Sequence, residues 1–451
     1  MKKLSLLLLL LLGLSVTELS AQNQMVMYNM HRSLPEANYL NPAFVPHYKV
    51  NIGLPGLASN QFAFTNGQLS FRDIFHYEGD SLIFINSDDD EDVLLGKLDE
   101  VNNIDMTGDI TLFYLGIGTE RSFVSVSVRE KYFSTFNYTR DLVGWVLKGP
   151  GSEDFSDRPL NVSDLYLEAT AYSEIAVGYS FQVANKLQLG ARIKMLQGQY
   201  NFHTAELEAG LYSGQDSAAI SVQNLLINTT GFDLNDGVVA DPGDVLGKFG
   251  NSGIGFSVGA KLKVNDRLSV NGAINYQGSI NWKENTRAYE LKDASYSFSG
   301  FDALELISKN DSSDQFLTQE QEAFKAAFDL TETANVTYRS RLPTTAYIGG
   351  SFRIIKGHFA GAVLHGALIE GNFRPAVNLS YNLFVKKFLN FSLSANLIEG
   401  QLNNIGTGLT INGGPVQVYF ISDNIMSWIY PARAKVADAR VGMNLTFGRR
   451  K

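Results

Sequence analysis

Strict alternation of apolar and polar residues recurs along this chain, with a period of two. In Leu268–Trp282, leucine, valine, isoleucine, tyrosine and tryptophan fall on one face, and serine, asparagine and glutamine fall mostly on the other. Leu187–Met195 and Leu389–Leu397 repeat the pattern. Because successive side chains of a β-strand point to opposite faces, these stretches predict strands with one apolar and one polar face.

A water-soluble β-sandwich gives the same alternation, so strand length and aromatic placement have to decide between the two. The alternating stretches run for about 10 to 15 residues, whereas strands of soluble proteins are mostly about 5 or 6 residues long. Tyr276 and Trp282 lie near the end of one stretch, where the aromatic girdle of a membrane barrel would lie. Both features favour an all-β fold, a transmembrane antiparallel β-barrel.

Short and long connections alternate between the predicted strands, as they do at the two ends of a membrane barrel. The pattern predicts about fourteen strands in a barrel spanning 61–448, at 61–71, 108–118, 121–134, 171–183, 187–200, 253–264, 268–283, 344–354, 357–369, 373–385, 388–399, 404–412, 415–422 and 438–447. Long extracellular loops are expected at about 72–107, 135–170, 201–252, 284–343 and 423–437. With an even number of strands, both ends of the barrel lie on the short-turn, periplasmic side.

The first residues predict export from the cytoplasm. Lys2 and Lys3 precede an apolar run from Leu4 to Val16, and Ala21 is a small residue before Gln22. This order is typical of a secretory signal peptide, here 1–21 with cleavage near Ala21, and the run is short for the alternative, an anchor helix. The chain has no cysteine, so neither disulfides nor a lipidated cysteine are expected.

Composition supports an outer-membrane barrel of a Gram-negative bacterium over two or three soluble domains. Charged residues make up 18% of the chain, below the roughly 25% of soluble domains, and aromatic residues make up 12%. Mean hydropathy is −0.06, and no later window holds enough successive apolar residues for a membrane helix. The net charge of −9 argues against a nucleic-acid partner.

No pattern of catalytic or metal-binding residues is present, so neither an enzyme nor a cofactor is predicted. The nucleophile elbow, the P-loop, the dinucleotide fold and the zinc helix motif are all missing. The six histidines fall in separate segments at no metal-ligand spacing. The acidic run Asp88–Asp92 invites a calcium hypothesis, but it lacks a calcium loop's glycine spacing, and a solvated extracellular charge run is favoured.

Five basic residues alternate with apolar ones and are therefore expected to face the lumen: Arg192, Lys194, Lys261, Lys263 and Arg440. A charge facing lipid near the midplane would cost about 2–4 kcal/mol, which supports this orientation. They could form a cationic patch that tunes the passage of anions or fatty carboxylates. Alternatively, they could pair with lumenal acids such as Glu174 or with an inserted segment, which is the favoured interpretation.

The residues between the signal peptide and the first predicted strand, 22–60, fit neither a helix nor a central strand. Within them, Asn38–Tyr48 reads NYLNPAFVPHY and holds two prolines, with Leu40, Phe44 and Val45 as apolar surface to bury. A barrel of this width needs something to fill its lumen. We therefore expect 22–60 to form a hatch or plug inside the barrel, with Asn41, Pro42, Ala43 and Phe44 at its centre.

The motif Asn41–Pro42–Ala43 resembles the start of two groups of outer-membrane barrels. One is the FadL-like fatty-acid transporter superfamily, and the other comprises the PorV and PorP/SprF proteins linked to type IX secretion and gliding. Ile421–Pro431 and Ala439–Gly448 are similar to an uncharacterised barrel family from type IX secretion bacteria. Phe447, near the end of the last strand, resembles the aromatic signal read by the barrel assembly machinery, although Gly448 to Lys451 follow it.

The resemblance and the pattern together predict a porin-like passive transporter or channel for small hydrophobic or amphipathic molecules, gated by the plug. Its partners would be outer-membrane lipid, the assembly machinery and a small hydrophobic ligand. The alternative is a non-transporting scaffold that binds secretion or motility proteins through its large loops. An outer-membrane enzyme is the remote alternative.

Overall fold

The protein is described from a computed structural model of the chain. It describes residues 24–78, 81–84, 88–149, 152–154, 156, 158–214, 217–234, 237–238, 250–298, 322, 326–369, 371–385, 388–398 and 401–450. The expected signal peptide and its cleavage point near Ala21 lie outside these residues.

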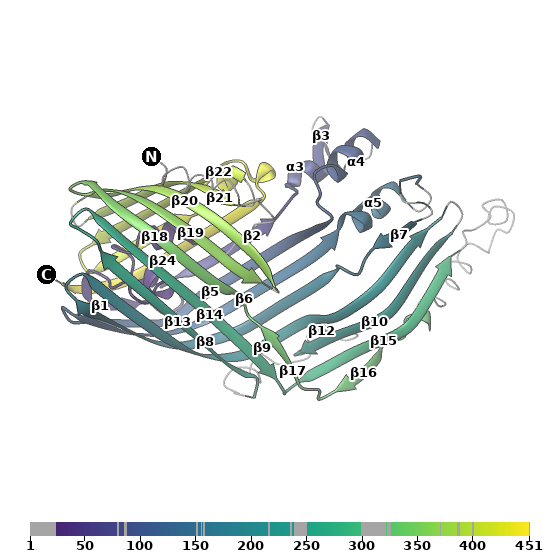
Figure 1. Ribbon diagram of the computed structural model, residues 1–451, viewed down its shortest axis with the longest axis horizontal. Coiled ribbons are helices and arrows are strands. Elements are labelled where there is room, and N and C mark those ends of the chain that lie inside the picture. Colours follow the sequence, from purple (N-terminus) through teal and green to yellow (C-terminus); the bar gives the residue numbers. More distant parts are fainter. Residues whose placement is uncertain are drawn as a thin grey trace, which may run out of the picture.

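Fourteen antiparallel strands close into a barrel, which confirms the predicted fold class (Figure 1). The first wall strand consists of β1 (Tyr48–Gly53) and β2 (Asn60–Asn66), which both pair with β5 and β24 and so complete the ring. The other thirteen are β5 (Val101–Gly118), β6 (Ser122–Thr139), β8 (Tyr166–Ala184), β9 (Leu187–Ser213), β13 (Ser252–Lys263), β14 (Leu268–Trp282), β18 (Thr344–Ile355), β19 (His358–Ile369), β20 (Asn372–Val385), β21 (Leu389–Ile398), β22 (Gln401–Gly413), β23 (Val416–Ser422) and β24 (Val436–Arg449). Each predicted strand coincides with one of these fourteen.

Along the wall strands, most apolar side chains point outward and most polar side chains point into the lumen, although some apolar wall residues also face the plug. On the outer face, Ile193, Ile254 and Leu379 are 69%, 71% and 61% exposed, whereas lumenal Arg192 and Asn275 are buried. An apolar band around a polar interior is the arrangement that a hydrocarbon surrounding requires. None of the helices among the described residues is long and apolar enough to cross a membrane.

The wall begins earlier in the chain than expected, at Tyr48 instead of Gln61. β1 and β2 form one strand that is interrupted at 54–59, where Pro55 supplies no amide hydrogen for the ladder. Backbone hydrogen bonds, such as the one from the Gly56 amide to the Thr111 carbonyl at 3.1 Å, keep residues 54–59 against the neighbouring strands β5 and β24. The segment inside the barrel therefore ends near His47, and we call residues 24–47 the plug.

The long connections leave one end of the barrel and carry structure of their own (Figure 1). β9 continues beyond the wall and pairs with β10 (Ala218–Thr230), which pairs with β15 (Thr286–Phe298), and β15 with β16 (Thr331–Ala334). This sheet, which we call the wing, replaces much of the loops expected at 201–252 and 284–343. The remaining elements at this end are α3 (Phe71–Ile74), β3 (Phe75–Glu78), β4 (Ser81–Phe84), α4 (Asp88–Leu95), α5 (Arg140–Lys148), β7 (Arg158–Asn161), β11 (Phe232–Asp233), β12 (Gly237–Val238), β17 (Tyr338–Arg341), α9 (Met426–Ile429) and η2 (Pro431–Arg433).

The plug contains two short elements, α2 (Met25–Asn29) and the 3₁₀ turn η1 (Pro35–Tyr39). It starts near the loop that follows β23 and ends at β1, on the short-turn end where the C-terminus also lies (Figure 1). One side of the plug packs into an apolar cluster of buried residues: Met25, Val26, Met27, Tyr28, Met30, Leu34, Ala37, Leu40 and Phe44 from the plug, with Tyr347, Val363, Ala376, Ile398, Tyr419, Ile421 and Val436 from the wall.

Candidate functional site: the plug and the lumen wall

The sequence motif Asn41–Pro42–Ala43 forms a tight turn within the plug. The Asn41 side-chain oxygen accepts a hydrogen bond from the Ala43 amide at 2.9 Å, which closes an Asx-type turn over Pro42. The Asn41 side-chain amide donates to the Tyr28 hydroxyl at 3.1 Å and to the Gly272 carbonyl of β14 at 3.2 Å. Asn41 therefore shapes the turn and also joins it to the wall.

Two wall glycines allow this turn to approach the strand backbone. A Cβ atom on Gly190 of β9 would lie 2.2 Å from the carbonyl carbon and oxygen of Pro42. A Cβ atom on Gly259 of β13 would lie 2.1 Å from the Asn41 side-chain oxygen. Both distances are far below van der Waals contact, so the plug turn occupies the space that any side chain at these positions would need.

Phe44 is the apolar anchor of the turn and is 1% exposed. Its ring meets the Tyr28 ring edge-on with centroids 4.8 Å apart and stacks on the His31 ring at 4.2 Å. The Lys261 ammonium lies 5.7 Å from the Phe44 centroid, within range of a cation–π contact. The four residues expected at the centre of the plug are thus all inside the lumen and in contact with one another or with the wall.

The opposite side of the plug meets charged and polar wall residues. Arg192 donates to the Asn38 side-chain oxygen at 2.7 Å, and Asn38 in turn donates to the carbonyls of Pro42 and Phe44 at 3.0 and 2.8 Å. Arg129 lies over the Tyr39 ring, 4.2 Å from its centroid. These two cations therefore contact the plug, Arg192 by a hydrogen bond and Arg129 by a cation–π contact.

Arg440 and Asp423 hold the start of the plug. Arg440 donates to the Gln24 side-chain oxygen at 3.0 Å. The Asp423 carboxylate accepts the amides of Met25 and Val26 at 3.1 and 2.9 Å, so a residue nearly 400 positions away caps α2. We call these two hydrogen bonds, from the backbone amides of Met25 and Val26 to the Asp423 carboxylate, the latch.

The other predicted residues lie in three different surroundings. Lys194 is buried in the lumen wall and donates to the Gln277 side chain at 3.0 Å. Lys263 lies at the rim, because β13 ends there, and it pairs with Asp266 of the following turn at 2.8 Å instead of entering the lumen. Phe447 is 44% exposed on the outer face of β24.

Several lumenal residues of the site were not expected from the sequence. Arg129 pairs with Asp109 at 3.0 Å and with Glu174, and Arg374 pairs with Asp105 at 2.6 Å. Glu174, which was expected to pair with the predicted basic residues, pairs with Arg129 and, at 3.6 Å, with Lys131. The alternation of side chains along each strand could have placed these residues in the lumen. Which of them pair with each other, however, depends on the register between neighbouring strands.

Glu36 is a fully buried carboxyl in the plug, and Asn444 donates to it at 2.6 Å. Burial raises the pKa of Glu36 from 4.5 to about 7. Glu36 in the seated plug holds its proton more tightly than Glu36 in a released, solvated plug would. Its contribution to plug binding is therefore fully present below pH 4.5 and is lost as the pH rises to about 7.

We predict that Glu36→Gln removes this dependence. The variant and the native protein should hold the plug alike near pH 4.5, and the variant should hold it more tightly above about pH 7. Channel opening in planar bilayers across this pH range measures the difference. Comparing the two proteins at each pH cancels the opposite effect of the plug residues His31 and His47, whose pKa values desolvation lowers. A pH-independent ratio between the two proteins would contradict the prediction.

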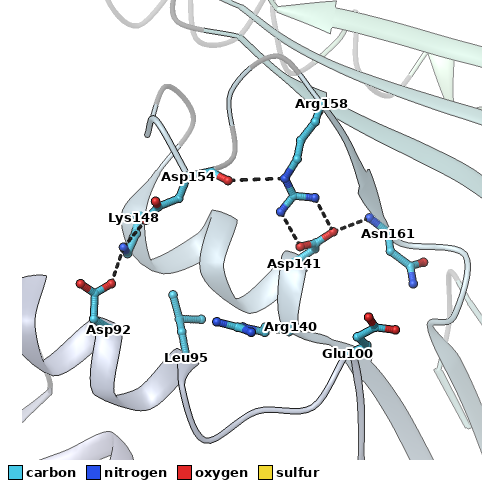
Figure 2. A pocket seen from close by; sticks show the side chains of 9 residues that line it. All are labelled: Asp92, Leu95, Glu100, Arg140, Asp141, Lys148, Asp154, Arg158 and Asn161. Atoms are coloured by element: carbon cyan, nitrogen blue, oxygen red, sulfur yellow. Dashed lines mark hydrogen bonds and ion pairs between the residues drawn. The ribbon is translucent and has the colours of Figure 1, made fainter.

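A second polar region lies at the long-loop end, in a pocket of about 670 Å³ between α4, α5 and β7 (Figure 2). Lys148 bridges Asp92 and Asp154, and the Arg158 guanidinium binds Asp141 through both terminal nitrogens at 2.7 and 3.0 Å. These pairs cross-link the three elements. Asp88–Asp92 forms the start of α4, and no three acidic or histidine side chains among the described residues gather as metal ligands.

Comparisons with known proteins give a family match and distant structural likenesses. The profile of a family of unknown function, DUF5723, matches residues 42–423. No curated protein matches this chain.

Among solved structures, the Pseudomonas putida toluene transporter TodX is 8% identical, with a TM-score of 0.43 and coverage of 93% of this chain and 94% of that one. A Pseudomonas aeruginosa FadL homologue is 11% identical, with a TM-score of 0.41 and coverage of 92% and 94%. The Ralstonia pickettii toluene transporter TbuX is 9% identical, with a TM-score of 0.43 and the same coverage. Similarity at this level says nothing about the activity of this chain.

Proposed function

We propose that this chain, which belongs to the family of unknown function DUF5723, is an outer-membrane channel that passes small amphipathic or hydrophobic molecules when its plug moves. The observation that carries the proposal is a plug bound by side chains inside a closed barrel with an apolar outer face. A barrel of fourteen strands is wide enough to need such a filling.

The seated plug packs closely against the lumen wall, so we expect passage to need plug movement. Between the plug residues Tyr39 and Leu40 and the wall there is a cavity of only about 40 Å³, little more than one water molecule. Larger pockets lie at the two ends of the barrel, about 670 and 500 Å³ in volume. Because the lumen wall carries hydrogen-bonding and charged groups, it suits amphipathic cargo better than purely apolar cargo.

A second candidate is a scaffold that presents its long-loop end to other proteins. The wing supports this candidate, because β9 extends for 27 residues, much more than the wall alone requires, and β10 and β15 continue it outward (Figure 1). Stoichiometric recovery of secretion or motility proteins with this chain from native membranes would favour the scaffold over the channel.

Asp423→Ala tests the channel directly. Removing the carboxylate leaves two buried amides without partners, a loss of about 1–3 kcal/mol of plug binding that is partly offset by relief of repulsion with Asp438. We expect open-channel events in planar bilayers to become about tenfold more frequent.

Glu100→Ala is the matched control, because it removes an exposed carboxylate at the same end with no contact to the plug among the described residues. If Asp423→Ala conducts no more often than Glu100→Ala while its plug becomes accessible to protease, the channel proposal fails.

A further inference from the structure

A pocket of about 500 Å³ opens at the short-turn end, between the plug and the wall strands β19 to β22. Its lining includes the basic residues Arg32, His47, Lys356, Arg449 and Arg450, and the aromatic residues Phe359 and Phe384. We call it the basic pocket. These side chains come from the plug, the start of β1, the turn between β18 and β19, and the C-terminal end of the chain, and the fold alone brings them together.

Within the described part of the chain, no neighbouring acid balances the positive charge of the basic pocket. Among the described residues, no carboxylate forms an ion pair with Arg32, Lys356, Arg449 or Arg450. Glu120 attracts Arg450, but it forms its ion pair with Lys49, at 3.4 Å.

The plug histidine at the pocket responds to this charge. Desolvation, together with repulsion from Arg32, Lys261, Arg449 and Arg450, lowers the pKa of His47 to about 4. Arg353 likewise lowers the pKa of Arg32 after burial does. A site in which several cations repel one another and no acid offsets them is stabilised by a bound anion.

Aromatic contacts hold two of the guanidinium groups in place. The Arg32 guanidinium lies over the Phe359 ring at 4.2 Å, and the Arg449 guanidinium lies 5.2 Å from the Tyr48 ring while donating to the Tyr48 hydroxyl at 3.2 Å. The buried Arg32 Nε has no hydrogen-bond partner. Fixed guanidinium groups with free donors suit oxyanions, since little side-chain freedom is lost on binding.

Two phenylalanine rings form an apolar part of the lining. The rings of Phe359 and Phe384 meet edge to face with centroids 5.4 Å apart. An apolar body can therefore rest on these rings while its charged end reaches the cations around them.

We propose that the basic pocket binds the phosphate group of an amphiphile from the periplasmic side. A multiply charged oxyanion matches four permanent cations better than a single carboxylate, which would neutralise only one. Such a multiply charged group is a phosphate monoester, which could belong to a lipid of the phosphatidic acid type or to a free organic phosphate, and the two aromatic rings of the pocket favour the lipid. The inference goes beyond the proposed channel and does not depend on passage of any molecule through the lumen.

Direct binding to the purified full chain in an uncharged detergent tests this proposal. The probes are dihexanoyl phosphatidic acid, inorganic phosphate, dihexanoyl phosphatidylcholine and hexanoate, measured by calorimetry. We expect phosphatidic acid to bind at least about tenfold more tightly than phosphatidylcholine or hexanoate. Inorganic phosphate binding as tightly as phosphatidic acid would assign the site to free phosphates, whereas weaker binding would assign it to lipid headgroups.

Two variants locate the binding. Arg32→Gln should weaken phosphatidic acid binding by at least about tenfold, and Lys356→Gln, at an exposed turn position where folding is not at risk, should weaken it several-fold. Lys186→Gln is the control, because it removes the same charge from an exposed turn at the same end but outside the pocket. Hexanoate binding as tightly as phosphatidic acid, no binding of either phosphate probe, or equal effects of Lys356→Gln and Lys186→Gln would each overturn the proposal.

Discussion

Replacing Gly190 with valine is expected to expel the plug turn from its seat while leaving the barrel wall intact. A Cβ atom at position 190 would lie 2.2 Å from the carbonyl atoms of Pro42 and 2.5 Å from the Ala43 amide nitrogen. These are backbone atoms, so no rotamer change can relieve the clash. The loss of plug binding should exceed the roughly 1–3 kcal/mol of ordinary overpacking.

Three measurements report on the barrel wall and on the plug separately. Heat-modifiable migration on gels should stay as in the native protein, because position 190 remains compatible with a strand. The plug should become accessible to protease, and conductance in planar bilayers should rise at least about tenfold.

Gly350→Val is the control for a valine in a wall strand. At position 350 the nearest atom to a new Cβ, the Ser269 carbonyl oxygen, is 3.9 Å away. This variant should behave as the native protein. If the plug of Gly190→Val stays protected from protease and the conductance is unchanged, the prediction is wrong. The plug turn would then have a second binding position in the lumen.

The wall could be predicted strand by strand because its period-two signal is long and is interrupted by tight turns. The strand predicted at 268–283 from its alternation, for example, forms β14 at Leu268–Trp282. The signal failed where strands leave the membrane region. β9 continues past Tyr200 to Ser213. β10 and β15 pair with each other although their partner residues are 56 to 80 positions apart in sequence, from Thr230 with Thr286 to Ala218 with Phe298, and local alternation does not encode such a long-range pairing.

The plug could be located from its prolines, but its end could not. The stretch Tyr48–Gly53 is only six residues long and Pro55 follows it, so it looks like part of the irregular segment. Its role as a wall strand depends on two partners, β5 and β24, that lie far away in the chain.

The candidate site was predictable in kind but not in detail. Strand parity placed Arg192 and Arg440 in the lumen, and the structure shows both bound to the plug. Asp423 was hidden within a segment expected to be a loop, and nothing in its local sequence marks it as the cap of a helix at the other end of the chain. Glu36 gave no signal either, since a lone glutamate beside a proline is ordinary in sequence.

Two deletions that differ only at the boundary between plug and wall are expected to have opposite outcomes. Deleting residues 24–46 removes the plug except for its last residue, His47, and keeps every wall strand. We expect a folded barrel whose conductance is much higher than that of the native protein and is no longer altered by Asp423→Ala, because the latch has lost its partner amides. Single-channel recording and gel migration measure both properties.

Extending the deletion to residue 55 should instead prevent closure of the barrel. That deletion removes β1, whose register runs from Tyr48 opposite Arg449 to Gly53 opposite Asn444, with β5 on its other side. Without β1, the short-turn halves of β5 and β24 would face lipid with unpaired amides and carbonyls, at a cost of several kcal/mol for each group. Loss of heat-modifiable migration in the longer deletion alone would place the boundary between residues 46 and 55. Equal folding of both would mean that β24 and β5 can pair directly, and the interrupted first strand would then be an insertion in a smaller barrel.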